Sequence, residues 1–161
     1  MTNQKIAVQD TYADDIAICY GCGRNNQHGL HVRTFWDGEI GHATFMPRPE
    51  HTAFLGIVYG GLLASLIDCH SLGTAIGAMY DEAGRELGST PVITCVTGNL
   101  NVSYKKPTPM GHELTLQTRV KELTEKKAII TTELFADGIV TVTGEVIAVR
   151  VPSRMVTGNT D

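Results

Sequence analysis

The sequence predicts an α+β fold, in which a curled antiparallel sheet of about six strands surrounds one long central helix. Two observations carry this prediction: an apolar segment runs from Gly60 to Tyr80, and strand-like runs separated by turn signals lie on both sides of it. A helix that is apolar almost all round must be covered on several sides, and strands joined by short turns pair antiparallel. The 161 residues, 42% of them hydrophobic, are typical of one compact domain.

The elements are predicted in the order hairpin, helix and four-stranded meander. Residues 30–36 and 40–46 flank the turn residues DGE and so predict a β-hairpin. Residues 47–56 contain two prolines and predict an irregular connection, and residues 81–91 predict a polar loop after the helix. Four further strands, separated by KPTPMG, a short charged turn and DG, are predicted at 92–104, 112–123, 126–137 and 139–151.

The chain is predicted to divide into a lead-in and loop at 1–29, the main domain at 30–152 and a frayed tail at 153–161. The lead-in shows weak helical periodicity, so we expect it to be loosely attached. An open sheet leaves edge strands, and pairing two subunits edge to edge would protect them. We therefore expect a homodimer or a dimer of dimers.

Charge and cysteine content limit the class of partner and the compartment. A net charge of −4 and a pI near 5.8 argue against a nucleic-acid-binding surface. The start of the chain lacks the apolar stretch of a secretory signal, and Asp68, His70 and the glycines argue against a membrane span in the apolar helix. We expect a cytoplasmic protein without a membrane partner, whose four cysteines are reduced thiols.

Asp68 interrupts the apolar helix eight residues after Gly60, the first of a glycine pair. A buried carboxylate is costly unless it is paired or used, and Ser65 and Leu72, which share its face by spacing, offer no counter-charge. Backbone N–H groups at a helix start are free to hold an oxygen that gains negative charge. The residues alone leave two interpretations open: a carboxylate that activates water or attacks a carbonyl, or a structural carboxylate beside glycines that permit tight packing.

The stretch from Tyr59 to Asp68 resembles the central-helix motif of the hotdog-fold acyl-CoA thioesterases, in their phenylacetyl-CoA-thioesterase-like branch. That motif reads His-Gly-Gly, six residues and then Asp, and this chain has Tyr59-Gly60-Gly61, LLASLI and Asp68. Four other segments are similar to the family, in the right order over most of the chain: CYGCGRNNQHGL, HTAFLGIVYGG, TGNLNVSYKKPTPMG and DGIVTVTGEV.

The resemblance implies the hotdog fold and hydrolysis of an acyl-CoA thioester. It implies that the Gly60 N–H polarises the thioester carbonyl, that Asp68 is the general base or nucleophile, and that Thr97 orients the water or the aspartate. It further implies a site between two subunits, with Thr97 facing Asp68 of the partner. No metal is implied, and no cofactor other than the coenzyme A of the substrate. Alternation along the strand places on one face Ile93, Cys95, Thr97, Asn99 and Asn101.

Tyr59 stands where the family usually has histidine. With Gly61 it is a candidate substrate-binding residue, since tyrosine can donate a hydrogen bond to a carbonyl oxygen or pack beside an acyl chain, but it cannot act as an imidazole. His51 and His70 lie nearby in the sequence and could compensate, although we expect them to be polar residues of a loop and of a helix flank.

Two further residue pairs can be interpreted either as ligand-binding residues or as structural ones. Lys105 and Lys106 end a predicted strand, where they could bind the phosphates of coenzyme A or form a solvated strand end. Cys19 and Cys22 form a C-x-x-C that, with two histidines downstream, could bind zinc or pack as reduced thiols. The spacing C-x2-C-x5-H-x2-H, which uses His28 and His31, is not that of a familiar zinc finger.

Two other functions stay open beside thioester hydrolysis. An acyl-thioester dehydratase or hydratase needs a paired histidine and acid, and no residue clearly fills the histidine role. A non-catalytic protein that binds acyl-CoA or an aromatic ligand is favoured by Tyr59 and opposed by the presence of Asp68 and Thr97 with the glycines.

Overall fold

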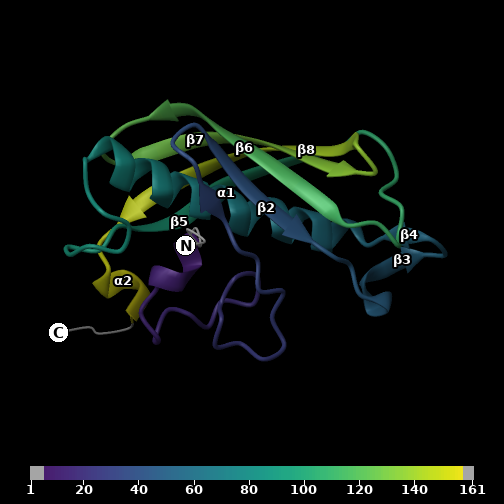
Figure 1. Cartoon of the computed structure of the whole chain (residues 1–161), viewed down its shortest axis with the longest axis horizontal. Helices are drawn as coiled ribbons and strands as arrows, with labels where there is room; N and C mark the ends of the chain where they lie inside the picture. The colour runs from purple at the N-terminus through teal and green to yellow at the C-terminus, as the bar shows by residue number, and fades with distance from the viewer. Residues whose placement is uncertain (1–5, 158–161) are drawn as a thin grey trace, which may run out of the picture.

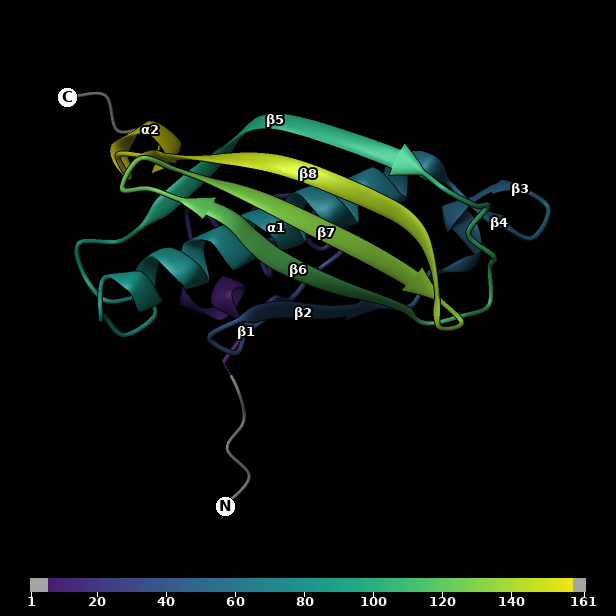
Figure 2. The same cartoon turned by 90° about the horizontal axis from the view of Figure 1, so that it is seen from above.

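A six-stranded antiparallel sheet curls around one long helix (Figure 1, Figure 2) in this computed structural model, which describes residues 6–157. The helix is α1, Gly60–Glu82. In spatial order the strands are β1 Phe35–Trp36, β2 Ile40–Phe45, β6 Leu114–Leu123, β7 Lys127–Ala136, β8 Ile139–Val151 and β5 Thr94–Tyr104. The predicted α+β fold with a central helix is therefore confirmed. The predicted four-stranded meander is wrong: only β6, β7 and β8 form one, because β5 pairs with β8 at the edge of the sheet and β6 pairs with β2.

The meander β6–β7–β8 forms because its residues alternate between a buried and a solvent-facing side. Leu116 pairs with Leu134, and Leu134 pairs with Val142, so that all three side chains face α1 and are at most 1% exposed. Alternation of this kind buries one face of a sheet against a helix and leaves the other in water. The apolar stripe of α1, including Leu66 and Ile67, packs into this face.

Shorter elements complete the fold around the ends of α1. They are η1 Val8–Thr11, η2 Pro49–His51, the two-stranded pair β3 Thr52–Phe54 with β4 Ile57–Val58, and α2 Arg154–Thr157. The segment expected to be an irregular connection thus holds a 3₁₀ turn and a small hairpin. The segment expected to be a frayed tail, residues 153–161, contains α2, and its last four residues lie outside the described part of the chain.

The expectation that the lead-in is loosely attached is wrong for residues 7–9. Val8 is fully buried, its N–H donates to the carbonyl of Thr34 at 2.9 Å, and the Gln9 side chain accepts from the Thr34 N–H at 2.7 Å. The physical reason lies in α1: a Cβ at Gly73 would come within 2.5 Å of the Thr34 hydroxyl. Small residues in the second half of α1 allow these segments to pack closely.

The sequence also predicts one face of β5 incorrectly. A bulge between Thr97 and Asn99 shifts the register, so that Thr97 lies opposite the buried Ala148 while Asn99 lies opposite Ile147. Thr97 therefore faces α1, whereas Asn99 and Asn101 face outward. An extra residue in one strand reverses the alternation that follows it.

Among the described residues, α1 is the one helix that is long and apolar enough to cross a membrane by length and composition. Its most apolar stretch is 72% buried inside the fold. The apolar character of α1 is therefore accounted for by its place in the core.

Candidate active site

The start of α1 presents free backbone N–H groups. Tyr59 is the N-cap residue; its N–H donates to the carbonyl of His51 at 2.8 Å, and its carbonyl accepts from the N–H of Leu62 at 3.1 Å. The N–H groups of Gly60 and Gly61 lie between these bonds and have no acceptor among residues 6–157. With the positive end of the helix dipole, they can hold an oxygen that carries negative charge.

A groove of about 400 Å³ lies beside this helix start. Its apolar walls include Phe54, Ile57 and Leu63, and its lining also includes Gly60, Lys105 and Lys106. The structure thus brings the predicted carbonyl-binding residue and the two predicted phosphate-binding lysines to one groove. An apolar groove with a few polar groups is the usual form of a small-molecule site.

Tyr104 is a residue of this groove that the sequence did not single out. Its hydroxyl donates to the carbonyl of Gly60 at 2.7 Å, and its ring would touch a Cβ at position 60 at 3.4 Å. Tyr104 therefore fixes the first turn of α1 from the edge strand β5. The sequence gives no local signal for this contact, since the two residues are 44 positions apart.

Asp68 and Thr97 form a close pair on the exposed side of α1. The Thr97 hydroxyl donates to Asp68 Oδ1 at 2.6 Å. Partial burial raises the pKa of the Asp68 carboxyl above its ordinary value, and the Thr97 hydrogen bond opposes that rise. The expected contact between Thr97 and the partner's Asp68 is corrected, because β5 lies beside α1 and the two side chains meet within one chain.

Gly60 and Asp68 do not meet within one chain. They belong to one continuous helix, and eight residues at 1.5 Å each place them about 12 Å apart along its axis. A carbonyl oxygen bound to the Gly60 N–H is therefore out of reach of the Asp68 carboxylate of the same chain. A single chain holds two halves of the predicted site at separate points.

Tyr59 lies across the glycine pair, while the two neighbouring histidines are buried. The Tyr59 side chain is 57% exposed, and a Cβ at Gly61 would come within 2.5 Å of its ring. His70 is fully buried, with Nδ1 2.9 Å from the Thr34 hydroxyl, and desolvation lowers the pKa of His70 to about 4. The expectation that His70 lies on a helix flank is wrong, and neither His70 nor His51, which is 8% exposed, replaces the missing imidazole.

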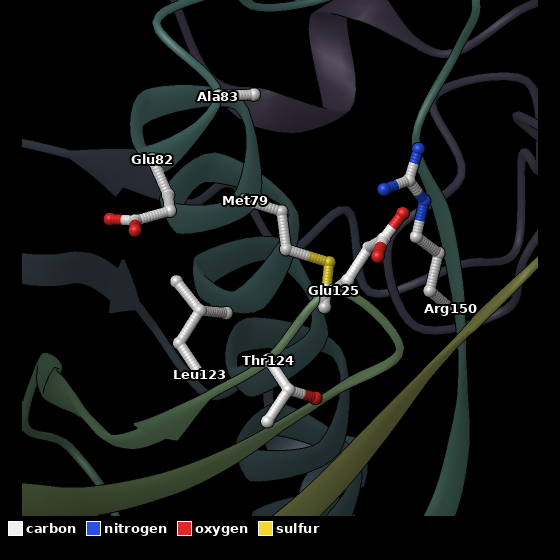
Figure 3. Close-up of a pocket in the computed structure, with 7 residues that line it drawn as sticks. All are labelled: Met79, Glu82, Ala83, Leu123, Thr124, Glu125 and Arg150. Atoms are coloured by element: carbon white, nitrogen blue, oxygen red, sulfur yellow. The ribbon is translucent and has the colours of Figure 1, made fainter.

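A second cavity, of about 290 Å³, lies at the other end of α1 (Figure 3). Met79, Leu123 and Arg150 line it, with none of the predicted site residues. The C-terminal end of a helix carries partial negative charge, so the backbone of α1 offers no oxyanion donor at this cavity, and the cation in its lining is Arg150.

Thr97 variants are expected to change the pH dependence of any reaction that uses ionised Asp68. The Thr97 hydrogen bond favours the charged carboxylate, so Thr97→Val raises the pKa of Asp68 further and moves the acid limb of the kcat/KM profile to higher pH. Thr97→Ser keeps a hydroxyl donor and should keep the limb near that of the unmodified protein. The measurement is a set of kcat/KM profiles for the three proteins, and identical acid limbs would contradict this role of Thr97.

The chain is similar to proteins of the thioesterase superfamily over most of its length. A family model described as the thioesterase superfamily matches residues 55–143, a range that contains Gly60, Asp68 and Thr97. A solved thioesterase superfamily protein from Shewanella loihica is 38% identical, with a TM-score of 0.65, and the match covers 89% of this chain and 99% of that one.

Two more distant solved structures share the fold. The E. coli PaaI protein from the phenylacetic acid degradation operon is 14% identical, with a TM-score of 0.62 over 76% of this chain and 80% of that one. A hypothetical thioesterase from Streptococcus pneumoniae, solved with coenzyme A, is 14% identical, with a TM-score of 0.59 over 71% of this chain and 82% of that one. None of the curated proteins matches the chain.

Proposed function

Because the chain belongs to the thioesterase superfamily and has the hotdog fold, we propose that it hydrolyses an acyl-CoA thioester to a free acid and coenzyme A. The observation that carries this proposal is the partly buried Asp68 carboxylate, which the Thr97 hydroxyl holds at 2.6 Å. The coenzyme A bound to the S. pneumoniae protein of the same fold supports a coenzyme A ester as the substrate class.

In the proposed reaction, the thioester carbonyl oxygen accepts a hydrogen bond from the Gly60 N–H. Asp68 takes a proton from a water molecule, whose oxygen attacks the carbonyl carbon; the C–S bond then breaks, and the coenzyme A thiolate leaves and is protonated. Thr97 occupies Asp68 Oδ1, which leaves Oδ2 to accept the proton. In the alternative, Asp68 attacks the carbonyl carbon, the C–S bond breaks and coenzyme A thiolate leaves; water then hydrolyses the mixed anhydride, which releases the acid and restores the Asp68 carboxylate.

The complete site is proposed to form between two copies of the chain. Gly60 of one copy would bind the carbonyl oxygen that Asp68 and Thr97 of the other copy act upon, because about 12 Å of helix separates these residues in one chain. Edge strand β5 supports such pairing: Val96 and Leu100 are each 38% exposed and Tyr104 is 54% exposed. Joining two β5 edges would cover apolar surface and bring the two half-sites together.

Lys105 and Lys106 are proposed to bind the phosphates of coenzyme A at the mouth of the groove. Their N–H groups both donate to the Thr141 carbonyl, at 2.8 and 3.1 Å, which fixes the backbone of the lysine pair next to the helix start. Cations at this position would hold the nucleotide while the thioester reaches Gly60.

Release of free thiol from short, medium, long and aryl acyl-CoAs tests the proposal, with a blank without substrate to correct for the four cysteines of the protein. We expect turnover of at least one acyl class. Tight binding of acyl-CoA without turnover would instead identify a binding protein, the alternative that Tyr59 favours. A dehydratase is disfavoured because His51 and His70 are both buried.

A further inference from the structure

Three of the four cysteines gather at one point although they are distant in the sequence. Cys19 and Cys22 belong to the N-terminal loop and Cys69 belongs to α1, and their sulfur atoms all lie within 4.8 Å of one another. The Cys19 and Cys69 sulfurs are 3.9 Å apart. The loop of residues 13–29 lies on the side of α1 away from the central strands (Figure 1).

We propose that Cys19, Cys22 and Cys69 form a binding site for one zinc ion, with a water molecule in the fourth position. Tetrahedral zinc with Zn–S bonds of about 2.3 Å places its sulfur ligands about 3.8 Å apart. The Cys19 and Cys69 sulfurs are already at that spacing. Cys19 is exposed, so a metal ion could reach the site from solvent. Cys22 and Cys69 are partly buried, so the surrounding protein would hold these two ligands in place.

The loop is shaped to present its sulfurs to α1. A Cβ at Gly21 would come within 2.2 Å of the Cys69 sulfur, so the glycine between the two loop cysteines permits their approach to the helix. The Gly23 N–H donates to the Cys19 carbonyl at 2.8 Å, and this bond holds the turn that contains both loop cysteines.

The proposed ligands differ from those that the sequence offers. Among the described residues, no histidine joins the three cysteines. The ring of His31 instead lies against the Asn26 carbonyl, at 2.6 Å from Nε2. The third ligand comes from α1, 47 residues after Cys22, which no local spacing could indicate.

A metal at this point would fasten the N-terminal loop to α1 beside Asp68. Cys69 follows Asp68 directly in α1. Binding to a preformed site stabilises the folded state in proportion to metal concentration. The proposal is independent of the chemistry proposed for Asp68, because its readouts are metal content and ligand spectra.

Titration of the reduced, metal-free full-length protein with Co²⁺ under anaerobic conditions tests this site, followed by displacement with Zn²⁺. We expect one equivalent of Co²⁺ to bind, with tetrahedral visible bands and a near-ultraviolet thiolate band that Zn²⁺ abolishes. Loss of a residue that only hydrogen-bonds a metal ligand typically weakens metal binding by about 10–100-fold. Cys19→Ser and Cys69→Ser each remove a ligand itself, so each should weaken Co²⁺ binding by more than this. Zinc should also raise the Tm of the unmodified protein.

Cys95→Ser is the matched control. Cys95 is buried elsewhere, with its thiol 3.7 Å from the Met79 sulfur, and this variant should keep the full cobalt spectrum. A protein with four titratable thiols that shows no thiolate-to-cobalt band at micromolar Co²⁺ overturns the proposal. A band that Cys69→Ser leaves unchanged overturns it as well, because α1 would then supply no ligand.

Discussion

Asp68→Asn is expected to lower the kcat of thioester hydrolysis by about 10²–10⁴-fold, the usual contribution of a general base. The substitution is nearly isosteric, and the amide oxygen can still accept the Thr97 hydroxyl that now lies 2.6 Å from Oδ1. Substrate affinity and folding should therefore persist. The measurement is kcat from thiol release, together with the acyl-CoA Kd from calorimetry.

The same variant is expected to be more stable than the unmodified protein at neutral pH. Partial burial raises the pKa of Asp68 in the folded state, so the folded state holds this proton more tightly than the unfolded state does. Stability is then lost as the pH rises through the window from the ordinary aspartate pKa to the folded one, and the loss persists above it. The uncharged amide of the variant does not lose stability in this way. The difference in Tm between the variant and the unmodified protein should therefore vanish at pH values below the folded and the unfolded pKa of Asp68.

Asp81→Asn provides the control for both measurements. Asp81 lies near the other end of α1, is exposed and accepts a hydrogen bond from the Trp36 indole at 3.2 Å. This variant should leave kcat unchanged. Hydrolysis by Asp68→Asn at the rate of the unmodified protein would refute the assignment of Asp68, whatever the effect on Tm.

Gly60→Pro is expected to lower kcat by about 10²–10³-fold, because it removes one oxyanion donor. Proline is well tolerated at the first helical position, and Tyr59 before it already has a compatible extended backbone with φ −61° and ψ 127°. Gly60→Ala keeps the N–H and adds a Cβ in ordinary contact with the Tyr104 ring, so it should lose far less. Equal losses of kcat in the two variants would mean that the absence of a side chain at position 60, rather than its N–H group, is what the reaction needs.

Mixed assemblies of the two defective chains test whether the site is shared. A heterodimer of Gly60→Pro and Asp68→Asn chains would have one site with both functional residues and one with neither. Random reassociation should therefore restore about one quarter of the unmodified activity. No recovery in demonstrated heterodimers would place the oxyanion donor and the base in the same chain.

The sequence predicts those parts of the fold that depend on local periodicity. The long apolar stripe predicts α1, and the alternation around Leu116 and Leu134 predicts the meander, because each pattern is fixed by the geometry of its own element. The docking of Val8 was missed because it depends on small residues of α1 more than 60 positions later, such as Gly73. The bulge beside Gly98 was missed because a period of two assumes an unbroken ladder.

The candidate site was predictable to a similar degree. Resemblance indicated Gly60, Asp68 and Thr97, and the structure places two of these in contact. Neither the contact of Tyr104 with Gly60 nor the approach of Cys69 to the loop cysteines has a sequence signal, because both join segments that are adjacent only after folding. The burial of His70 follows from the hairpin that covers it, where Gly41 offers its carbonyl at 3.2 Å.

The position of α1 in the chain has a consequence for synthesis on the ribosome. α1 ends at Glu82, whereas the strands that bury its apolar surface extend to Val151. At about 5–20 residues per second, the ribosome leaves this surface without its cover for several seconds. We therefore expect the nascent chain to need chaperones during that interval, and expression yield to respond to chaperone supply more strongly than the stability of the finished protein suggests.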